Sequence, residues 1–246
     1  LTALHDSGRS SLTNLMSSPQ SSFMKHLGRI NQHLSDRKRL VVGAIADPST
    51  LSIKPTDCDI VELRLDSLGT GKEVHQFAKT CPLPVLITAR GPEEGGQSSW
   101  STEERAHAYR AFLPYAAIID IELCDFKALG SVIDDAKGIG IPVIGSLHDF
   151  EVTPEPASLT EKINTRADLH KFAFMAQSSD DIKKHLEIFE RLSGHALSVM
   201  GMGPLGAAAR PLMAEAGSLL NYGFLGTTPT APNQWPAGLL KATLAI

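Results

Sequence analysis

Eight short runs of apolar residues, rich in β-branched side chains, recur from Leu40 to the end of the chain, and segments of helical pattern separate them. Each run has the length and composition of a buried parallel strand. Eight strands alternating with helices predict an α/β protein with the (β/α)8 TIM-barrel fold. The runs are Leu40–Ala46, Asp59–Asp66, Pro84–Arg90, Ala117–Leu123, Ile141–His148, Leu169–Met175, Ala196–Met202 and Leu220–Gly226.

Three of the intervening segments carry specific helix signals. Ser101–Pro114 opens with Ser followed three residues later by Glu, which is the capping-box arrangement. Phe126–Lys137 ends before Gly138, which we expect to be its C′ glycine, and Ser179–Leu192 is apolar along one face. A doubly wound open sheet is the main alternative fold. The turn after the first strand lacks the Gly-rich dinucleotide fingerprint of that fold.

Length and composition predict one soluble globular domain. The 246 residues are 42% hydrophobic and 20% charged, and α/β barrels of roughly 250 residues are single units. We assign residues 40–246 to the barrel and residues 1–39 to a Ser-rich extension, partly mobile, with one amphipathic helical piece around Phe23–Leu34. The net charge of -4 provides no general attraction to nucleic acid or anionic lipid.

Cysteine usage and hydropathy predict a cytoplasmic protein. The three cysteines are odd in number and widely spaced, so neither a disulfide framework nor a zinc site is indicated. No apolar run approaches the ~18 residues that a membrane span needs. We therefore expect no zinc site and no membrane partner.

Two neighbouring strands each present one ionisable side chain, His148 in the fifth and Lys171 in the sixth. Residues at the carboxyl ends of neighbouring parallel strands converge on one crevice. Lys171 has two interpretations. It either forms a structural salt bridge with a carboxylate such as Glu122 or Glu62, or it is a nucleophilic amine. The second interpretation requires that burial and nearby cations lower its pKa from the ordinary ~10.4.

His148 also has two interpretations, a structural histidine bonded to a backbone carbonyl or a general base. A base needs a carboxylate that orients its ring, and we favour Glu94 over Asp149. Asp149 directly follows His148 and is better placed to bond the loop backbone. Glu94 lies in a Gly-rich turn, where Gly95 and Gly96 permit close approach of the backbone to a ligand.

Further charged residues interrupt the apolar runs. Glu62 and Arg64 are two residues apart in the second strand, as are Asp120 and Glu122 in the fourth, so each pair points to one side of its strand. An unpaired charge inside a barrel is costly. We therefore expect a mutually paired polar network at the mouth of the barrel.

The loops after the last two strands offer ligand contacts. Gly201–Arg210 is either a phosphate-binding turn or a plain turn into a helix, and Arg210 could bind a carboxylate through its bidentate fork. Thr228–Trp235 resembles a lid, with Thr230 and Gln234 as hydrogen-bond donors.

Six motifs, in order from about Val41 to the carboxyl end, together resemble the type I 3-dehydroquinate dehydratases, which are Schiff-base barrel enzymes of the shikimate pathway. The motifs are ELRLD (Glu62–Asp66), TxR…EGG (Thr88–Gly96), SLHDF (Ser146–Phe150), KFA (Lys171–Ala173), MGM…R (Met200–Arg210) and TAPNQ (Thr230–Gln234).

This resemblance implies a cofactor-free syn-elimination of water from 3-dehydroquinate, which yields 3-dehydroshikimate. Lys171 matches the imine-forming lysine, His148 the base and Glu94 its carboxylate partner. The resemblance also assigns substrate-binding positions around the ring hydroxyls, at the substrate carboxylate, on the apolar walls and in the closing loop. Glu62, Arg64 and Arg90 match the positions around the ring hydroxyls, and Arg210 matches the position at the substrate carboxylate. Met200 and Met202 match the apolar walls, and Thr230 and Gln234 match the closing loop.

The chain departs from the family pattern in the lid, where Thr230 replaces a common Ser and Asn233 a common Gly. Homodimerisation is a further expectation from the family. Two alternative functions remain open at this point. One is a class I aldolase, which would share the lysine imine but need a phosphate site at the Gly201–Arg210 turn, and the other is a catalytically silent barrel that binds a metabolite or a partner.

Overall fold

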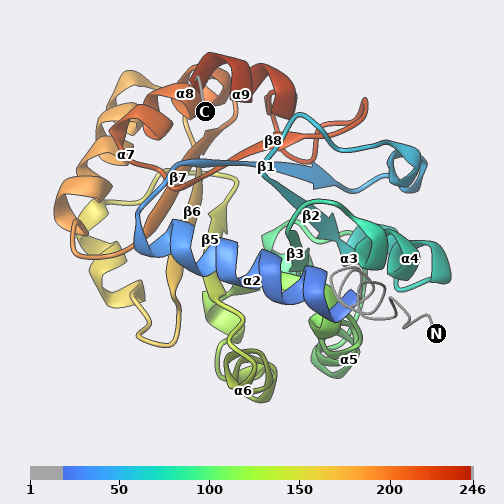
Figure 1. Cartoon of the computed structure of the whole chain (residues 1–246). Helices are drawn as coiled ribbons and strands as arrows, with labels where there is room; N and C mark the ends of the chain where they lie inside the picture. Colours follow the sequence, from blue (N-terminus) through green and yellow to red (C-terminus); the bar gives the residue numbers. More distant parts are fainter. Residues whose placement is uncertain (1–18, 245–246) are drawn as a thin grey trace, which may run out of the picture.

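Eight parallel strands form a nearly closed barrel in the computed structural model, which describes residues 19–244 (Figure 1). The strand order is β7-β6-β5-β4-β3-β2-β1-β8, so strands that follow one another in sequence pair with one another in space. The predicted (β/α)8 fold is confirmed. The strands are β1 Leu40–Ile45, β2 Ile60–Arg64, β3 Val85–Thr88, β4 Ala116–Glu122, β5 Val143–Asp149, β6 Leu169–Met175, β7 Leu197–Met202 and β8 Leu220–Phe224.

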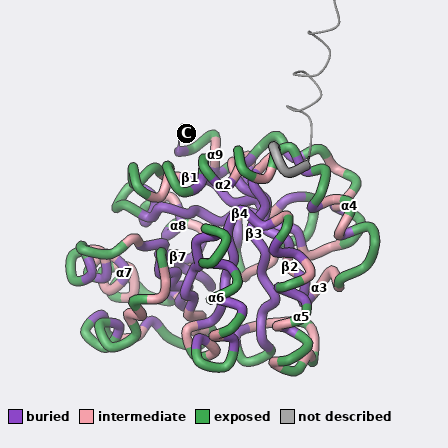
Figure 2. Tube along the Cα trace, turned by 60° about the horizontal axis from the view of Figure 1, so that its bottom comes forward, coloured by how far each residue is buried: buried purple, intermediate pink, exposed green. Residues whose placement is uncertain are grey.

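Helices surround the barrel, with the strands buried and the outer helix faces exposed (Figure 2). Both capping-box hydrogen bonds are present at Ser101, as the sequence predicted, and a second capping box at Ser178 starts α7. The helices that follow the strands are α3 (Leu65–Leu68), α4 (Lys72–Thr80), α5 (Thr102–Phe112), α6 (Gly130–Gly138), α7 (Ser179–Arg191), α8 (Gly206–Ala216) and α9 (Ala237–Leu244).

Two helical predictions were wrong in detail. The helix expected over Phe126–Lys137 begins only at Gly130, because a 3-10 turn follows β4, and it includes Gly138. The glycine with left-handed backbone is Gly140, with φ of 81°. Between β5 and β6 the polar segment forms only the 3-10 helix Pro156–Lys162.

Helix α2 (Pro19–Ser35) lies across the amino end of the barrel (Figure 1). Leu27 and Ile30 are buried on its inner face, and Ile30 packs with residues at the starts of the strands, among them Leu40 and Ile60. Residues 1–18 of the predicted N-terminal extension lie outside the described residues. The described part of that extension contributes a helix that closes one end of the barrel.

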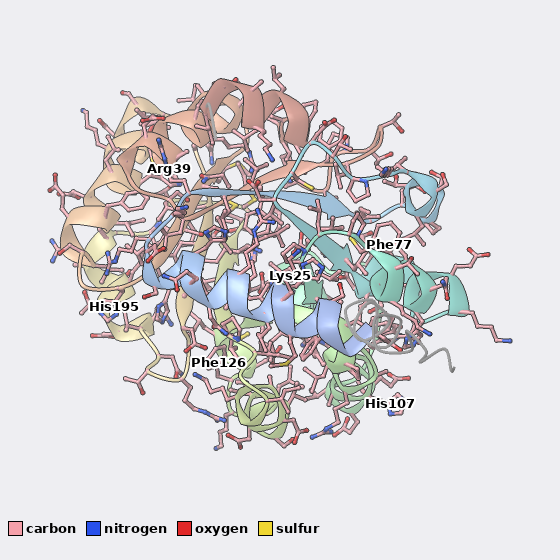
Figure 3. All side chains as sticks on the ribbon, in the orientation of Figure 1. Lys25, Arg39, Phe77, His107, Phe126 and His195 are labelled. Atoms are coloured by element: carbon pink, nitrogen blue, oxygen red, sulfur yellow. The ribbon has the colours of Figure 1, made fainter. Side chains whose placement is uncertain are left out.

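Apolar side chains form one layer inside the barrel and two between the strands and the helices. Phe77 of α4 and Phe126 after β4, both labelled in Figure 3, pack into the outer layer around β1 to β5. The inner layer ends at Met200, Met202 and Tyr222. Above these residues the interior becomes polar, and this is where the ligand cavity lies.

The seam between β7 and β8 is closed by serine side chains and by one backbone bond, from Leu219 N–H to Leu197 O over 2.9 Å. Within the described residues no strand ladder joins these two strands. Instead, Leu220 N–H donates to Ser198 Oγ over 2.8 Å, and Val199 N–H donates to Ser218 Oγ over 3.1 Å. The serine hydroxyls therefore satisfy backbone donors that a continuous ladder would otherwise use.

Candidate active site

A cavity of about 260 Å³ opens at the carboxyl ends of the strands, and it is lined by all eleven residues that the sequence nominated. Parallel strands all end at one rim, so side chains from distant parts of the sequence meet there. The eleven residues are Glu62, Arg64, Arg90, Glu94, His148, Lys171, Met200, Met202, Arg210, Thr230 and Gln234.

Lys171 and His148 lie on the same wall of the cavity. In the ladder between β5 and β6, Lys171 pairs with Ser146 and His148 pairs with Ala173. Paired residues point to the same face of a sheet, and residues two apart on one strand share a face. With a rise of about 3.3 Å per residue, His148 therefore lies about 7 Å nearer the rim than Lys171.

Glu94 holds His148 by two contacts to one oxygen. Glu94 Oε2 lies 2.8 Å from Nδ1 of His148 and accepts the backbone N–H of the same residue over 2.9 Å. Burial, together with the charges of Arg90 and Lys171, lowers the pKa of His148 well below its ordinary value. The imidazole is therefore neutral near pH 7, with the Nδ1 proton directed to Glu94 and the Nε2 lone pair free to accept a proton.

Asp149, the alternative partner for His148, bonds the loop backbone instead, accepting from the amides of Glu151 and Val152.

Burial raises the pKa of Glu94 to about 7. The Glu94 carboxylate is thus present at and above neutral pH. Below that pH it becomes a neutral acid, which no longer serves as a charged acceptor for His148.

The carboxylate beside Lys171 is Asp120, and not Glu122 or Glu62, which the salt-bridge interpretation had suggested as partners. Lys171 Nζ donates to Asp120 Oδ2 over 2.7 Å and lies 4.4 Å from the centroid of the Tyr222 ring. Burial alone would raise the pKa of Asp120, but Arg90 and Lys171 hold it at about 2. Asp120 therefore remains an anion and does not accept a proton from the amine.

Arg90 is fully buried and lies at the centre of the polar network. Its Nη2 lies 3.0 Å from Asp120, and its Nη1 donates to Ser146 Oγ over 2.6 Å. Glu122 lies 3.6 Å from Arg90 and also pairs with Arg105, a buried side chain from α5. Asp120 and Glu122 are thus each matched by a cation, as the sequence predicted for this strand.

The second strand contributes two separate contacts to the network. Arg64 forms a bidentate pair with Asp66, at 2.9 and 2.7 Å. Glu62 accepts a hydrogen bond from Thr88 Oγ1 over 2.8 Å. Because Thr88 occupies only Oε1 of Glu62, Oε2 of Glu62 remains available to accept a hydrogen bond from a ligand in the cavity.

Arg210 is the buried cation that lacks a counter-charge. Only 3% of its surface is exposed, and it makes no ion pair within residues 19–244. Its Nη1 donates to the backbone carbonyl of Tyr222 over 2.9 Å, whereas Nε and Nη2 have no partner in that same range. Burial lowers the pKa of Arg210 to about 10, so it is still charged near pH 7. A bidentate anion such as a carboxylate would satisfy both orphaned donors.

The loop after β8 closes one side of the cavity and bonds to itself. Gln234 Oε1 accepts from both the backbone N–H and the hydroxyl of Thr230, over 2.8 and 2.9 Å. Asn233 has a left-handed backbone with φ of 54°, and its side chain donates to Gly203 O over 2.7 Å. Asn adopts this conformation more readily than other non-glycine residues. This preference accounts for Asn at a position where the family commonly has Gly.

Two backbone donors in the turn after β7 are already bonded within the protein. Leu205 N–H donates to Ala176 O, and Gly206 N–H donates to Gly203 O, each over 2.9 Å. A phosphate site at a helix start needs free backbone donors. These bonds favour the interpretation as a plain turn into α8 and disfavour the aldolase alternative.

The glycines of the Glu94 turn have different roles. Gly95 lines the cavity with φ of 84°. A Cβ at Gly96 would lie 2.2 Å from Arg90 O, so Gly96 is required by the turn itself. The sequence-based suggestion that both glycines approach a ligand was therefore wrong for Gly96.

A family model and individual relatives agree with this geometry. The model of the type I 3-dehydroquinases matches residues 47–246. This chain belongs to the type I 3-dehydroquinase family. A 3-dehydroquinate dehydratase of Methanococcus maripaludis is 36% identical over 195 residues, which are 76% of this chain and 88% of the relative. One from Methanocaldococcus jannaschii is 34% identical over 190 residues, 74% of this chain and 84% of the relative.

Solved structures of 3-dehydroquinate dehydratases share the fold. The enzyme of Geobacillus kaustophilus superposes with a TM-score of 0.74 at 23% identity, covering 85% of this chain and 90% of the other. That of Aquifex aeolicus has a TM-score of 0.69 at 26% identity, covering 83% and 96%. Both likenesses support the barrel fold.

Sequence reasoning missed several residues that shape the site in this member of the type I 3-dehydroquinase family. Asp120 was recognised as a charge in a strand but not as the partner of Lys171. Arg105 lies outside every motif and becomes relevant only through its contact with Glu122. Tyr222 lines the cavity from β8, and its inward position two residues after Leu220 was the only signal available.

Neither a membrane span nor a metal cluster occurs in the described residues. No helix between residues 19 and 244 combines the length and hydropathy that crossing a bilayer requires. The same residues contain no group of three or more His, Cys, Asp and Glu side chains placed to hold a metal ion.

Proposed function

We propose that this chain is a hydro-lyase of the shikimate pathway that converts 3-dehydroquinate to 3-dehydroshikimate through an imine on Lys171. The observation that carries the proposal is one cavity that contains a lysine, a neutral histidine oriented by a carboxylate, and a buried arginine without a counter-charge. These groups suit the ketone, the acidic C–H bond and the carboxylate of this substrate. Family membership and the names of the relatives add independent support.

The first step joins the substrate ketone to the amine. With the substrate carboxylate on Arg210, Lys171 Nζ attacks the carbonyl carbon, and water leaves as the C=N bond forms. The amine must first lose a proton. Asp120, with its pKa of about 2, does not accept that proton, whereas the free Nε2 of His148 on the neighbouring strand does. His148 then gives the proton to the hydroxyl that leaves as water, so Nε2 is free again once the protonated imine has formed.

The elimination follows from the charge on the imine. The protonated C=N group withdraws electrons and acidifies the adjacent C–H bond, from which His148 Nε2 removes a proton. The resulting enamine expels the hydroxyl from the next carbon, and that hydroxyl takes the proton from His148 and leaves as water. Hydrolysis of the imine then releases the conjugated ketone and regenerates Lys171.

The test measures formation of the product enone by its ultraviolet absorbance when 3-dehydroquinate is supplied. In parallel, borohydride is added and the chain is digested for mass spectrometry, with a reduced adduct expected on Lys171. If only a sugar phosphate were trapped on Lys171, the chain would be an aldolase. An enone signal no greater than that of buffer, without any adduct, would support the catalytically silent barrel.

Two further properties remain proposals. We propose a cytoplasmic location, which rests on cysteine usage and on the biosynthetic reaction. We also propose a homodimer, which rests on the family resemblance alone. Sedimentation or light scattering of the purified chain tests the second proposal.

A further inference from the structure

The hydroxyl of Tyr222 is a buried polar group without a partner. Tyr222 is 4% exposed and lines the cavity, yet its hydroxyl has no hydrogen-bond partner in the described chain. The equally buried Tyr109 is bonded twice, to Asp120 O and to Ala89 N–H. A buried hydroxyl without a partner costs free energy. Its position in a ligand cavity indicates that a ligand completes it.

The ring of Tyr222 locates this hydroxyl relative to the reacting amine. Lys171 Nζ lies 4.4 Å from the ring centroid, so the ring of Tyr222 borders the place where a substrate carbon would join Lys171. The carboxylates of Glu62 and Asp120 act on the hydroxyl and, added to burial, raise the pKa of Tyr222 well above its ordinary value. Tyr222 is therefore protonated near pH 7 and is a hydrogen-bond donor.

Arg210 is bonded to the opposite end of the same residue, the backbone carbonyl of Tyr222. Tyr222 pairs with Val42 of β1, and Ala44, two residues further along β1, pairs with Glu62 of β2, so Tyr222 and Glu62 both line the cavity from strands that flank β1. The hydroxyl thus belongs to the part of the cavity near the amine and Glu62. It is not a second donor to the carboxylate that we assign to Arg210.

Glu62 and Tyr222 offer complementary functions. An ionised carboxylate only accepts hydrogen bonds, and the Tyr222 hydroxyl is available to donate. A substrate hydroxyl both donates and accepts, so it satisfies the two side chains together. We propose that Tyr222 donates to a substrate hydroxyl on the carbon next to the ketone, while Glu62 accepts from it. This inference rests on the proposed function and makes Tyr222 a residue that selects α-hydroxy ketones.

The test is Tyr222→Phe, which removes the hydroxyl and keeps the ring against Lys171. We expect kcat/KM for 3-dehydroquinate to fall about tenfold, because one hydrogen bond to a neutral group is lost. Borohydride trapping on Lys171 should persist. The thermal midpoint should not fall, since no protein–protein hydrogen bond is broken.

A substrate comparison distinguishes this role from a structural one. Against an analogue of 3-dehydroquinate that lacks the hydroxyl next to the ketone, the wild type should lose about 10²-fold in kcat/KM, because a buried donor is then left unpaired. In Tyr222→Phe the difference in kcat/KM between the same two substrates should be much smaller. Equal discrimination by wild type and Tyr222→Phe would overturn the inference, even if the variant were slower on both.

Tyr115→Phe is the matched control. Tyr115 directly precedes β4 at the amino end of the barrel, beside His75 and outside the cavity. Removal of the Tyr115 hydroxyl should therefore leave kcat/KM for 3-dehydroquinate and for the analogue unchanged. Failure of the wild type to turn over or trap 3-dehydroquinate would instead overturn the proposed function. The two failures are therefore separable in one set of measurements.

Discussion

Arg90 and Arg210 are both almost fully buried at the carboxyl end of the barrel, but the protein surrounds them differently. Arg90 lies among Asp120, Glu122 and Glu94 and also bonds a serine hydroxyl. Arg210 has one backbone carbonyl and, within residues 19–244, no carboxylate. The β3 to β6 side of the cavity is thus electrostatically complete within the chain, whereas the β7 to β8 side needs a partner from outside.

The difference separates two uses of buried charge. On the paired side, charges hold one another in place and fix the orientation of the reacting groups. On the unpaired side, donors without partners are a cost that a bound anion or hydroxyl removes. The seam between β7 and β8 has no ladder, and Arg210 reaches the carbonyl of Tyr222 at that seam.

The largest effect is expected on the paired side, from Lys171→Ala. Without the amine no imine forms, so turnover should fall by more than about 10³-fold and borohydride should trap no adduct. His148→Ala should instead retain or accumulate the adduct with little turnover. Unimpaired turnover in His148→Ala would remove it as the base and would leave Lys171 as the reacting group of the paired side.

The second prediction compares the loss of each arginine in its effect on the stability of the protein. Arg90→Met should lower the free energy of unfolding by at least about 3 kcal/mol, because buried carboxylates lose their cation. Arg210→Met should change it by no more than about 1 kcal/mol, since only a bond to one carbonyl is lost. The same Arg210 variant should raise KM for 3-dehydroquinate about 100-fold. Urea denaturation and steady-state kinetics measure the two effects, and similar losses of stability in both variants would contradict the comparison.

The third prediction concerns the pH dependence of the paired side. Burial raises the pKa of Glu94 to about 7, so kcat should fall as the pH drops through about 7 and the carboxylate that orients His148 is protonated. Because an acid with a raised pKa is stabilised by its proton, this stabilisation is complete below the ordinary pKa of about 4.5 and is lost as the pH rises through about 7.

Glu94→Gln separates these two effects, because the amide imitates the protonated acid. The variant should be more stable than the wild type above about pH 7, and the difference should vanish at low pH. Its lower kcat should no longer change near pH 7. A wild-type kcat that stays constant from about pH 5 to about pH 9 would show that Glu94 does not control the base.

The smallest effect is expected in the lid on the unpaired side. Asn233→Ala loses both the left-handed preference and the bond to Gly203, whereas Asn233→Gly loses only the bond. We expect the alanine variant to raise KM about threefold and the glycine variant to raise it less, because Ala strains the backbone by about 1 kcal/mol. Equal KM values in the two variants would assign the whole effect to the Gly203 contact.

Much of the fold was predictable because its signals are local. The eight strands were recognised from their apolar runs, and the helix after Ser101 from its capping box. Errors arose where the helical pattern was interrupted, as in the 3-10 segment between β5 and β6, and where a later left-handed glycine, Gly140, followed the helix. The packing of α2 against the amino end depends on the assembled barrel, which its weak amphipathic pattern did not specify.

The sequence by itself determined which chemical groups are available, because a lysine, a histidine and an arginine beside buried strand ends are visible as exceptions in apolar runs. Only the tertiary structure decided which of these groups meet. Lys171 and Asp120 are 51 residues apart, and their contact depends on how the strands are staggered around the barrel. The same staggering supplies carboxylates to Arg90 and none to Arg210, since a charge is paired or unpaired only through neighbours that folding brings within a few ångströms.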